Sequence, residues 1–302
     1  MVDSRIRKLE DGLRARVSRF VSDNSQWCSC RYNALQRIRE FGRHTFLCGG
    51  AVRDILLSDR QNHIIPRDLD IVFGYTDIKN VADSFSDCTK RWNCYGGVSI
   101  QVKDWSIDMW PLHKTWAFEK KYVEGKGFSD FPKTTFLNIE AVAIQLFTKK
   151  GEKREIYSKG FFEAILDKTI EINLKENPNP PTCVVRSLSV AKKFKFAIGP
   201  TLAGYITHYA NKIGLEKLLE LYQVRYGSTH FSVNELYSCI KAIEGQLRVS
   251  AKEPVKLPIS DNKNYFHLIQ GDHIGEKGMQ LLIDLPAGRQ ESRDCGIGLV
   301  VG

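Results

Sequence analysis

Hydrophobic positions along the first part of the chain follow a helical spacing and then shorten to a strand-like run. Apolar residues recur at steps of three and four over residues 6–21 and again over 35–41, which predicts two amphipathic helices. A short apolar run then ends at Gly49-Gly50, and a helical pattern follows over 51–57. The expected order is therefore helix, helix, strand, glycine turn and helix.

Alternating positions predict further strands, and two of these strands carry acids. Residues 68–73 alternate, and they place Asp68 and Asp70 on one face because i and i+2 side chains of a strand point the same way. A hairpin is predicted over 98–110, with Asp108 between apolar neighbours on its second strand. A buried carboxylate is costly unless it meets a cation or hydrogen-bond donors. Asp108 is therefore either a site residue or a solvent-facing residue of an edge strand.

A stiff proline-rich segment divides the chain. Residues 177–181 read Asn-Pro-Asn-Pro-Pro, which predicts a non-helical hinge. We expect N-terminal helices over 1–44 that pack on a catalytic domain at 45–176, then a helical part over 177–250. A polar C-terminal segment over 251–302 is expected to be poorly ordered. The predicted fold class is α+β, with a small mixed β-sheet covered by helices and followed by an all-α part.

The glycine turn and the paired acids have a joint chemical interpretation. Gly49 and Gly50 lack Cβ atoms, so backbone N–H groups there approach an anion closely, and the positive end of the next helix points to the same place. Asp68 and Asp70 repel each other without a cation, and Mg²⁺ takes carboxylate oxygens while leaving positions for substrate phosphates. Each feature alone is common on protein surfaces. Together they predict a phosphate cradle opposite a metal-binding carboxylate pair.

The chain is similar to the catalytic head of the class II nucleotidyltransferases in two segments, GGAVRDILL and RDLDIVF. These enzymes, within the DNA polymerase beta superfamily, are the bacterial-type poly(A) polymerases and the CCA-adding tRNA nucleotidyltransferases. The resemblance covers roughly residues 45–200 and implies transfer of nucleotides from an NTP to an RNA 3′ end, with release of pyrophosphate. It implies that Asp68 and Asp70 hold two Mg²⁺ ions and that the third carboxylate is Asp108, with Asp104 as the competing residue. One ion would lower the pKa of the acceptor hydroxyl, and the other would stabilise the leaving pyrophosphate.

The same resemblance assigns the residues around the glycine turn to nucleotide binding. Gly49 and Gly50 would hold the triphosphate through backbone donors, and Arg53 would add positive charge nearby. Asp54 is expected to be a structural partner that orients Arg53 or caps a turn. Val52 and its apolar neighbours are core residues whatever the function.

The resemblance weakens after the first acids. Asn138 matches the asparagine of the family's Arg-Arg-Asp-Phe-Thr-Ile-Asn-Ala motif. Pro132, Lys133 and Thr134 stand where that motif has Arg-Arg-Asp, so Lys133 would keep a phosphate-binding charge while the acid is lost. Arg186 matches the second arginine of the neck motif, Glu-Asp-x-x-Arg-x-x-Arg-Ala-x-Arg-Phe. Asn179 and Pro180 replace the acidic pair of that motif. Those residues help choose the incoming base in the family, so the replacement argues against a CCA-adding enzyme.

Composition bears on partners more than on fold. The formal net charge of +9 favours a polyanionic partner such as RNA. The helix predicted after the hinge carries Lys192, Lys193 and Lys195, which form either a solvated face or a track for RNA. Segment 111–133 interleaves aromatic residues and lysines, a pattern that suits either a grip on single-stranded nucleic acid or a plain mobile loop.

Cysteines and hydropathy limit the cellular setting. The chain has 8 cysteines, of which Cys48 and Cys183 lie in apolar patterns and are expected to be reduced core thiols. Cys28-x-Cys30 is too tightly spaced for an ordinary zinc pair. No run of about 18 apolar residues and no signal-peptide pattern are present, so we expect a cytoplasmic protein without a membrane segment. The sequence does not specify an oligomeric state.

Two other functions remain open. The same chemistry on a protein side chain or a small molecule fits the lost base-selecting acids, although superfamily members of that type usually carry Gly-Ser at the phosphate turn. A non-catalytic RNA-binding module on the same fold is the third hypothesis. The intact Gly49, Gly50, Asp68 and Asp70 argue against that module.

Overall fold

The computed structural model describes residues 3–25, 28–58, 64–103, 105–125, 127–226 and 231–258. The chain forms two compact units, each described by itself below. The first unit runs to Thr135 and takes in Ile139–Glu163, and the second takes in Phe136–Asn138 and the described residues from Ala164 onward. Asp104 and the predicted polar segment beyond residue 258 lie outside the described residues.

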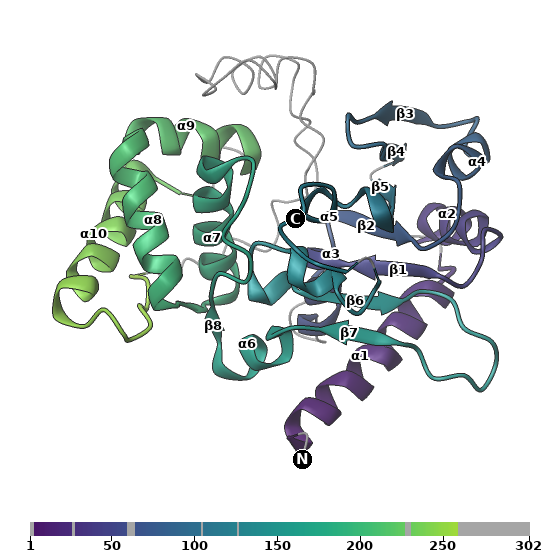
Figure 1. Ribbon diagram of the computed structural model, residues 1–302, viewed down its shortest axis with the longest axis horizontal. Coiled ribbons are helices and arrows are strands. Elements are labelled where there is room, and N and C mark those ends of the chain that lie inside the picture. Colours follow the sequence, from purple (N-terminus) through teal and green to yellow (C-terminus); the bar gives the residue numbers. More distant parts are fainter. Residues whose placement is uncertain are drawn as a thin grey trace. The chain divides into compact units, whose positions relative to one another are not determined.

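A seven-stranded mixed sheet forms the centre of the first unit, with strand order β3-β4-β5-β2-β1-β6-β7 (Figure 1). Strands β2 and β5 run parallel, and every other neighbouring pair is antiparallel. The mixed sheet with attached helices confirms the predicted α+β class. The strand bounds are β1 Thr45–Cys48, β2 Asp68–Phe73, β3 Thr89–Trp92, β4 Val98–Val102, β5 Trp105–Pro111, β6 Val142–Gln145 and β7 Ile156–Ser158.

Helices of the first unit follow the predicted order. The two N-terminal helices and the helix after the glycine turn are all present, and the first buries Leu13, Val17 and Val21 as its apolar spacing requires. Its N-terminus is capped by Asp3, whose side chain accepts from the backbone N–H of Arg5 at 2.8 Å. The bounds are α1 Ser4–Ser22, α2 Ser29–Arg39, α3 Gly49–Leu57, α4 Ile78–Asp83 and α5 Trp116–Glu119, with 3₁₀ turns η1 Leu112–Lys114 and η2 Phe131–Thr134. Helix α6 Phe161–Asp167 and the 3₁₀ turn η3 Asn138–Glu140 have residues in both units.

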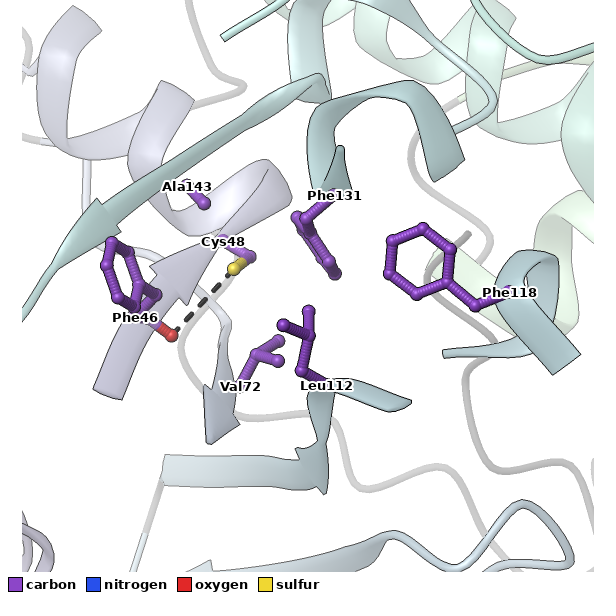
Figure 2. Packing of buried hydrophobic residues seen from close by; sticks show 7 residues of the cluster. All are labelled: Phe46, Cys48, Val72, Leu112, Phe118, Phe131 and Ala143. Carbon is purple, nitrogen blue, oxygen red and sulfur yellow. Dashed lines mark hydrogen bonds between the residues drawn. The ribbon is translucent and has the colours of Figure 1, made fainter. Parts of the chain in front are cut away.

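The face of the sheet that carries the acids is apolar at the opposite end of the same strands. Phe46 and Val72 lie there, each two residues along its strand from the end where Cys48 and Asp70 pair. Residues from the segments after β5 pack onto this end, Phe131 among them. Figure 2 shows the cluster, which consists of Phe46, Cys48, Val72, Leu112, Phe118, Phe131 and Ala143. The apolar cluster therefore covers the Phe46–Val72 end of the face and extends to Cys48, the direct partner of Asp70.

Four helices make up most of the second unit (Figure 1). Their bounds are α7 Pro180–Phe194, α8 Pro200–Ile213, α9 Leu215–Tyr226 and α10 Val233–Val249, and a parallel pair, β8 Thr169–Ile170 with β9 Ala197–Ile198, accompanies them. The predicted non-helical hinge over 177–181 is right only for residues 177–179, because α7 begins at Pro180, where proline fits the first helical turn, and the Asn179 side chain caps the helix. Within the described part of the chain, no helix combines the length and the apolar character needed to cross a membrane.

Candidate active site

The glycine turn joins β1 directly to α3. Cys48 is the last extended residue, and Gly49 has a φ of 64°, in the left-handed region that favours glycine. Helix α3 starts at Gly49 and buries most of its residues, so the turn is held by a firmly packed helix. The first backbone N–H groups of a helix have no partner within that helix. They are the donors that a phosphate would use.

The sheet register brings two of the predicted acids together. Asp70 is the direct partner of Asp108 across the parallel pair β2–β5, and it is also the direct partner of Cys48 across β1–β2. Directly paired residues point to the same face of a sheet, and neighbouring strands lie about 4.8 Å apart. Asp68 lies on this face too, two residues before Asp70. The acids and the glycine turn therefore meet at one end of the sheet.

The acids differ in their surroundings. Burial raises the pKa of Asp108, a hydrogen bond with Ser99 acts in the opposite direction, and the charge of Asp68 raises it further. Burial also raises the pKa of the Cys48 thiol well above its ordinary value, and the negative charge of Asp70 adds to this effect. Burial and a nearby carboxylate raise the pKa of Asp108 and the pKa of Cys48, as expected where several acidic groups share one partly desolvated face. A bound cation would oppose both increases.

Asp68 is engaged by a neighbouring arginine. Its Oδ2 accepts hydrogen bonds from Arg67 Nη2 at 2.6 Å and from Arg67 Nε at 2.8 Å. Among the residues that the structure describes, no group of three or more His, Cys, Asp and Glu side chains is arranged to hold a metal ion. The backbone positions suit a shared site, and the carboxylate oxygens are the donors that Mg²⁺ prefers. To bind the cation together with Asp70 and Asp108, the Asp68 carboxylate would give up its hydrogen bonds with Arg67.

Arg53 lies behind the glycine turn in a buried ionic group. Its side chain is 9% exposed, its Nε and Nη2 lie 2.8 Å and 2.7 Å from Asp54 Oδ1, and its Nη1 donates to Glu140 Oε1 at 2.8 Å. The expectation that Asp54 orients Arg53 is confirmed. A Cβ atom added to Gly50 would lie 3.2 Å from Arg53 Nη2, so the guanidinium packs against the turn. Arg53 therefore supports the backbone of the turn from inside.

The remaining predicted nucleotide-binding residues make other contacts or belong to the second unit. Lys133, in the first unit, pairs with Asp130 at 2.7 Å and keeps about half of its side chain exposed. Asn138 belongs to the second unit, where its side-chain oxygen accepts from the backbone N–H of Glu171 at 2.9 Å. Arg186 is a half-buried residue of α7 in the second unit. The structure thus brings together the glycines and the three acids, with Arg53 behind them.

Three residues near the acids and the turn were missed by the sequence interpretation. Glu140 is 2% exposed and is a charge within an apolar run, which signals a buried partner such as Arg53. Arg67 precedes the acid that it binds. Ser99 is the β4 residue paired with Asp108, and this pairing depends on a register that local spacing does not reveal.

Two segments interpreted as either RNA contacts or exposed elements are packed only in part, since Lys121 and Tyr122 of the first and Lys195 of the second remain exposed. In segment 111–133 the rings of Trp116, Phe118 and Phe131 are buried. In the basic helix α7, Lys192 is neither on a solvated face nor on an RNA track, because its side chain is 7% exposed and its Nζ lies 3.1 Å from Glu235 Oε1. Long amphipathic side chains bury their stems readily, which spacing alone does not distinguish from exposure.

Comparisons with known proteins give weak likenesses. No protein-family model and no curated protein matches the chain. A solved CCA-adding enzyme in its apo form I aligns over 78% of this chain and 61% of its own, with 16% identity and a TM-score of 0.48. The Thermotoga maritima CCA-adding enzyme complexed with tRNA aligns over 77% and 61%, with 17% identity and a TM-score of 0.46. A tRNA nucleotidyltransferase complexed with a primer tRNA and an incoming ATP analog aligns over 70% and 69%, with 16% identity and a TM-score of 0.44. The chain thus spans less than two thirds of the first two enzymes, and scores of this size assign no function.

Proposed function

We propose that this chain is a Mg²⁺-dependent nucleotidyltransferase that adds nucleotides from an NTP to the 3′ end of an RNA. The observation that carries the proposal is the row formed by Cys48, Asp70 and Asp108 on three adjacent strands. This row sets two carboxylates on one face and starts the glycine turn one residue beyond Cys48. A phosphate cradle beside paired acids is the arrangement that metal-assisted phosphoryl chemistry requires.

The donor set fits Mg²⁺. Asp68, Asp70 and Asp108 supply only carboxylate oxygens on one face, where Asp68 and Asp108 are half-buried and Asp70 is 6% exposed. Bound there, the metal would acidify the acceptor hydroxyl and neutralise charge on the leaving pyrophosphate. Arg67, already beside Asp68, would remain near the site as a second positive charge.

The chain's own residues perform the remaining tasks. Backbone N–H groups at Gly49 and Gly50, with the dipole of α3, would orient the triphosphate. The acceptor 3′ oxygen forms a bond to the α-phosphorus while the bond from that phosphorus to the β-bridging oxygen breaks. Pyrophosphate leaves with the electron pair, and the hydroxyl proton passes to solvent or to a carboxylate. Arg53, held by Asp54 and Glu140, would keep the turn rigid during these steps.

An RNA acceptor is favoured by the formal net charge of +9 and by Gly-Gly at the phosphate turn. Lys192 adds nothing to this argument because it is buried against Glu235. Mass spectrometry of RNA and protein after incubation with each NTP would identify the acceptor. If the protein gains the nucleotide mass and the RNA does not, the acceptor is a protein and not an RNA.

Incorporation of labelled nucleotide tests the chemistry. Wild-type protein, Asp68→Ala and a control Asp83→Ala would each be incubated with total RNA, Mg²⁺ and one of four labelled NTPs. Asp83 is an exposed acid at the end of α4 and serves as the matched control. We expect incorporation by wild type and Asp83→Ala, with a loss of at least about 10²-fold in Asp68→Ala and in chelator. Equal incorporation by wild type and Asp68→Ala would end the hypothesis.

A further inference from the structure

The row of residues that contains the acids continues to the edge of the sheet. Asp108 on β5 is paired with Ser99 on β4, and Ser99 is paired with Arg91 on the edge strand β3. Because directly paired residues share a face, Arg91 and Ser99 point to the same side as Asp70 and Asp108. A guanidinium, a hydroxyl and two carboxylates therefore lie in one line across four strands.

This part of the face is polar and open. Arg91, Thr89 and Gln101 are exposed, while Ser99 and Ser106 are half-buried and their hydroxyl oxygens lie 3.3 Å apart. The strand residues of the apolar cluster described above belong to β1, β2 and β6. The opposite side of β4 and β5 is apolar and buried, through Val98, Ile100, Ile107 and Met109. Packing thus accounts for the inner side of this hairpin and leaves its outer side for a polar partner.

Charge identifies the kind of partner. Arg91 lies close enough to Asp108 for its positive charge to act on that carboxylate. A charged residue on an edge strand also protects the sheet against pairing with another chain, which is the other role to weigh. Lys90, on the same strand but paired with Ile100 and so facing the other side, fills that protective role equally well. Of these two basic residues, Arg91 is the one that shares the face of the acids.

The geometry points to a binding surface for the sugar-phosphate backbone of the acceptor RNA, formed by Arg91, Ser99 and Gln101. This inference rests on the proposed function. With the terminal 3′ hydroxyl at Asp70 and Asp108, the chain of the acceptor continues toward β3, and Arg91 binds its nearest phosphate. Guanidinium groups bind phosphate through paired, charge-assisted hydrogen bonds. Gln101 supplies an amide donor for sugar and phosphate oxygens, and the Ser99 oxygen, whose proton goes to Asp108, accepts from a sugar hydroxyl.

Binding and turnover of a short single-stranded RNA test this surface. Arg91→Ala and Arg91→Glu would be compared with wild type and with Lys90→Ala as the matched control from the other side of the strand. We expect the KM for RNA to rise about 10-fold or more in Arg91→Ala, and further in Arg91→Glu, with the KM for NTP unchanged. The slope of log affinity against log salt should fall by about 0.7, which corresponds to one phosphate on a single strand. Lys90→Ala should match wild type.

Fluorescence anisotropy with a labelled oligonucleotide separates this inference from the proposed function. If wild type incorporates nucleotide but Arg91→Glu binds the RNA as tightly as wild type, the proposed RNA-binding surface is wrong and the proposed enzymatic activity is supported. A second outcome is that wild type binds RNA, that Arg91→Glu does not, and that neither protein incorporates nucleotide. The RNA-binding surface is then supported and the proposed enzymatic activity is wrong. An equal loss of RNA affinity in Lys90→Ala overturns the surface, because charge alone then explains the effect. Circular dichroism confirms that each variant is folded.

Discussion

Asp70 and Asp108 are direct partners on the parallel strands β2 and β5. Two carboxylates side by side on one face disfavour the folded state unless a cation joins them, and burial already raises the pKa of Asp108. We predict that Asp108→Asn is at least as stable as wild type in chelator, because the neutral amide avoids the cost of desolvating a charge. Incorporation of nucleotide by this variant should fall at least about 10²-fold.

Thermal unfolding and the incorporation assay measure these two quantities on the same preparations. Asp83→Asn, an exposed acid of α4, should leave both unchanged. Opposite movement of stability and activity is the pattern of a functional residue kept at a cost to the fold. A destabilised Asp108→Asn with full activity would make Asp108 a structural residue.

Gly50→Ala tests the contact between the turn and Arg53. The added Cβ would lie 3.2 Å from Arg53 Nη2 and 3.7 Å from Glu140 Oε1, so the buried ionic group must shift. We expect the free energy of unfolding to fall by about 1–3 kcal/mol and the KM for NTP to rise. In Gly204→Ala, within α8, the added Cβ meets nothing within 4 Å. That variant should be stabilised by about 0.5–1 kcal/mol. Urea unfolding checks both, and a stable Gly50→Ala with unchanged KM would contradict the contact.

Local patterns were sufficient for the part of the fold that holds the site. Alternation over β2 placed Asp68 and Asp70 on one face, and the two glycines marked the start of α3, because both signals depend on neighbours in sequence. The hairpin of β4 and β5 followed for the same reason. Strand β3 was not predicted, because its residues are mostly exposed and polar and an edge strand lacks the apolar alternation of a half-buried one.

Contacts between residues far apart in the chain could not be predicted from local sequence patterns. Arg53 and Glu140 are separated by 87 residues, and no spacing rule pairs them. Lys192 had the spacing of a surface lysine but is buried against Glu235 and Phe231. The register that sets Asp70 beside Asp108 follows from which strands become neighbours, a property of the whole sheet.

Arg53→Met should be among the more destabilising single substitutions in the first unit. It removes a buried cation that contacts two buried carboxylates, those of Asp54 and Glu140, and breaking a buried ionic group costs about 3–5 kcal/mol. Arg53→Lys keeps the charge but cannot fork between two carboxylates, so we expect an intermediate loss. Denaturant unfolding of both variants measures the order. A Met variant as stable as the Lys variant would show that charge is unimportant there.

Lys192→Met distinguishes a packing lysine from an RNA-binding one. Lys192 Nζ lies 3.1 Å from Glu235 Oε1 and 4.2 Å from the centroid of the Phe231 ring. Loss of this charge-assisted contact should lower the free energy of unfolding by about 1–3 kcal/mol. The affinity for RNA should not change. Lys212→Met, at an exposed position of α8, should change stability by less than about 0.5 kcal/mol. Weaker RNA binding by a folded Lys192→Met would support the interpretation of Lys192 as an RNA-binding residue.

Alkaline pH should destabilise the second unit through Cys239. Burial raises the pKa of this thiol from 9.0 to about 11. The folded state therefore holds the proton more tightly than the unfolded state, and this contribution is complete below pH 9 and is lost as the pH rises toward 11. Cys239→Ala lacks the contribution at every pH, so its deficit relative to wild type should shrink over that interval by about 2 kcal/mol, somewhat less than the full equivalent of two pKa units. Urea unfolding under reducing conditions at pH 8, 9, 10 and 11 (about one unit apart) measures the deficit. A deficit that stays constant across the series would show that Cys239 does not titrate differently in the two states.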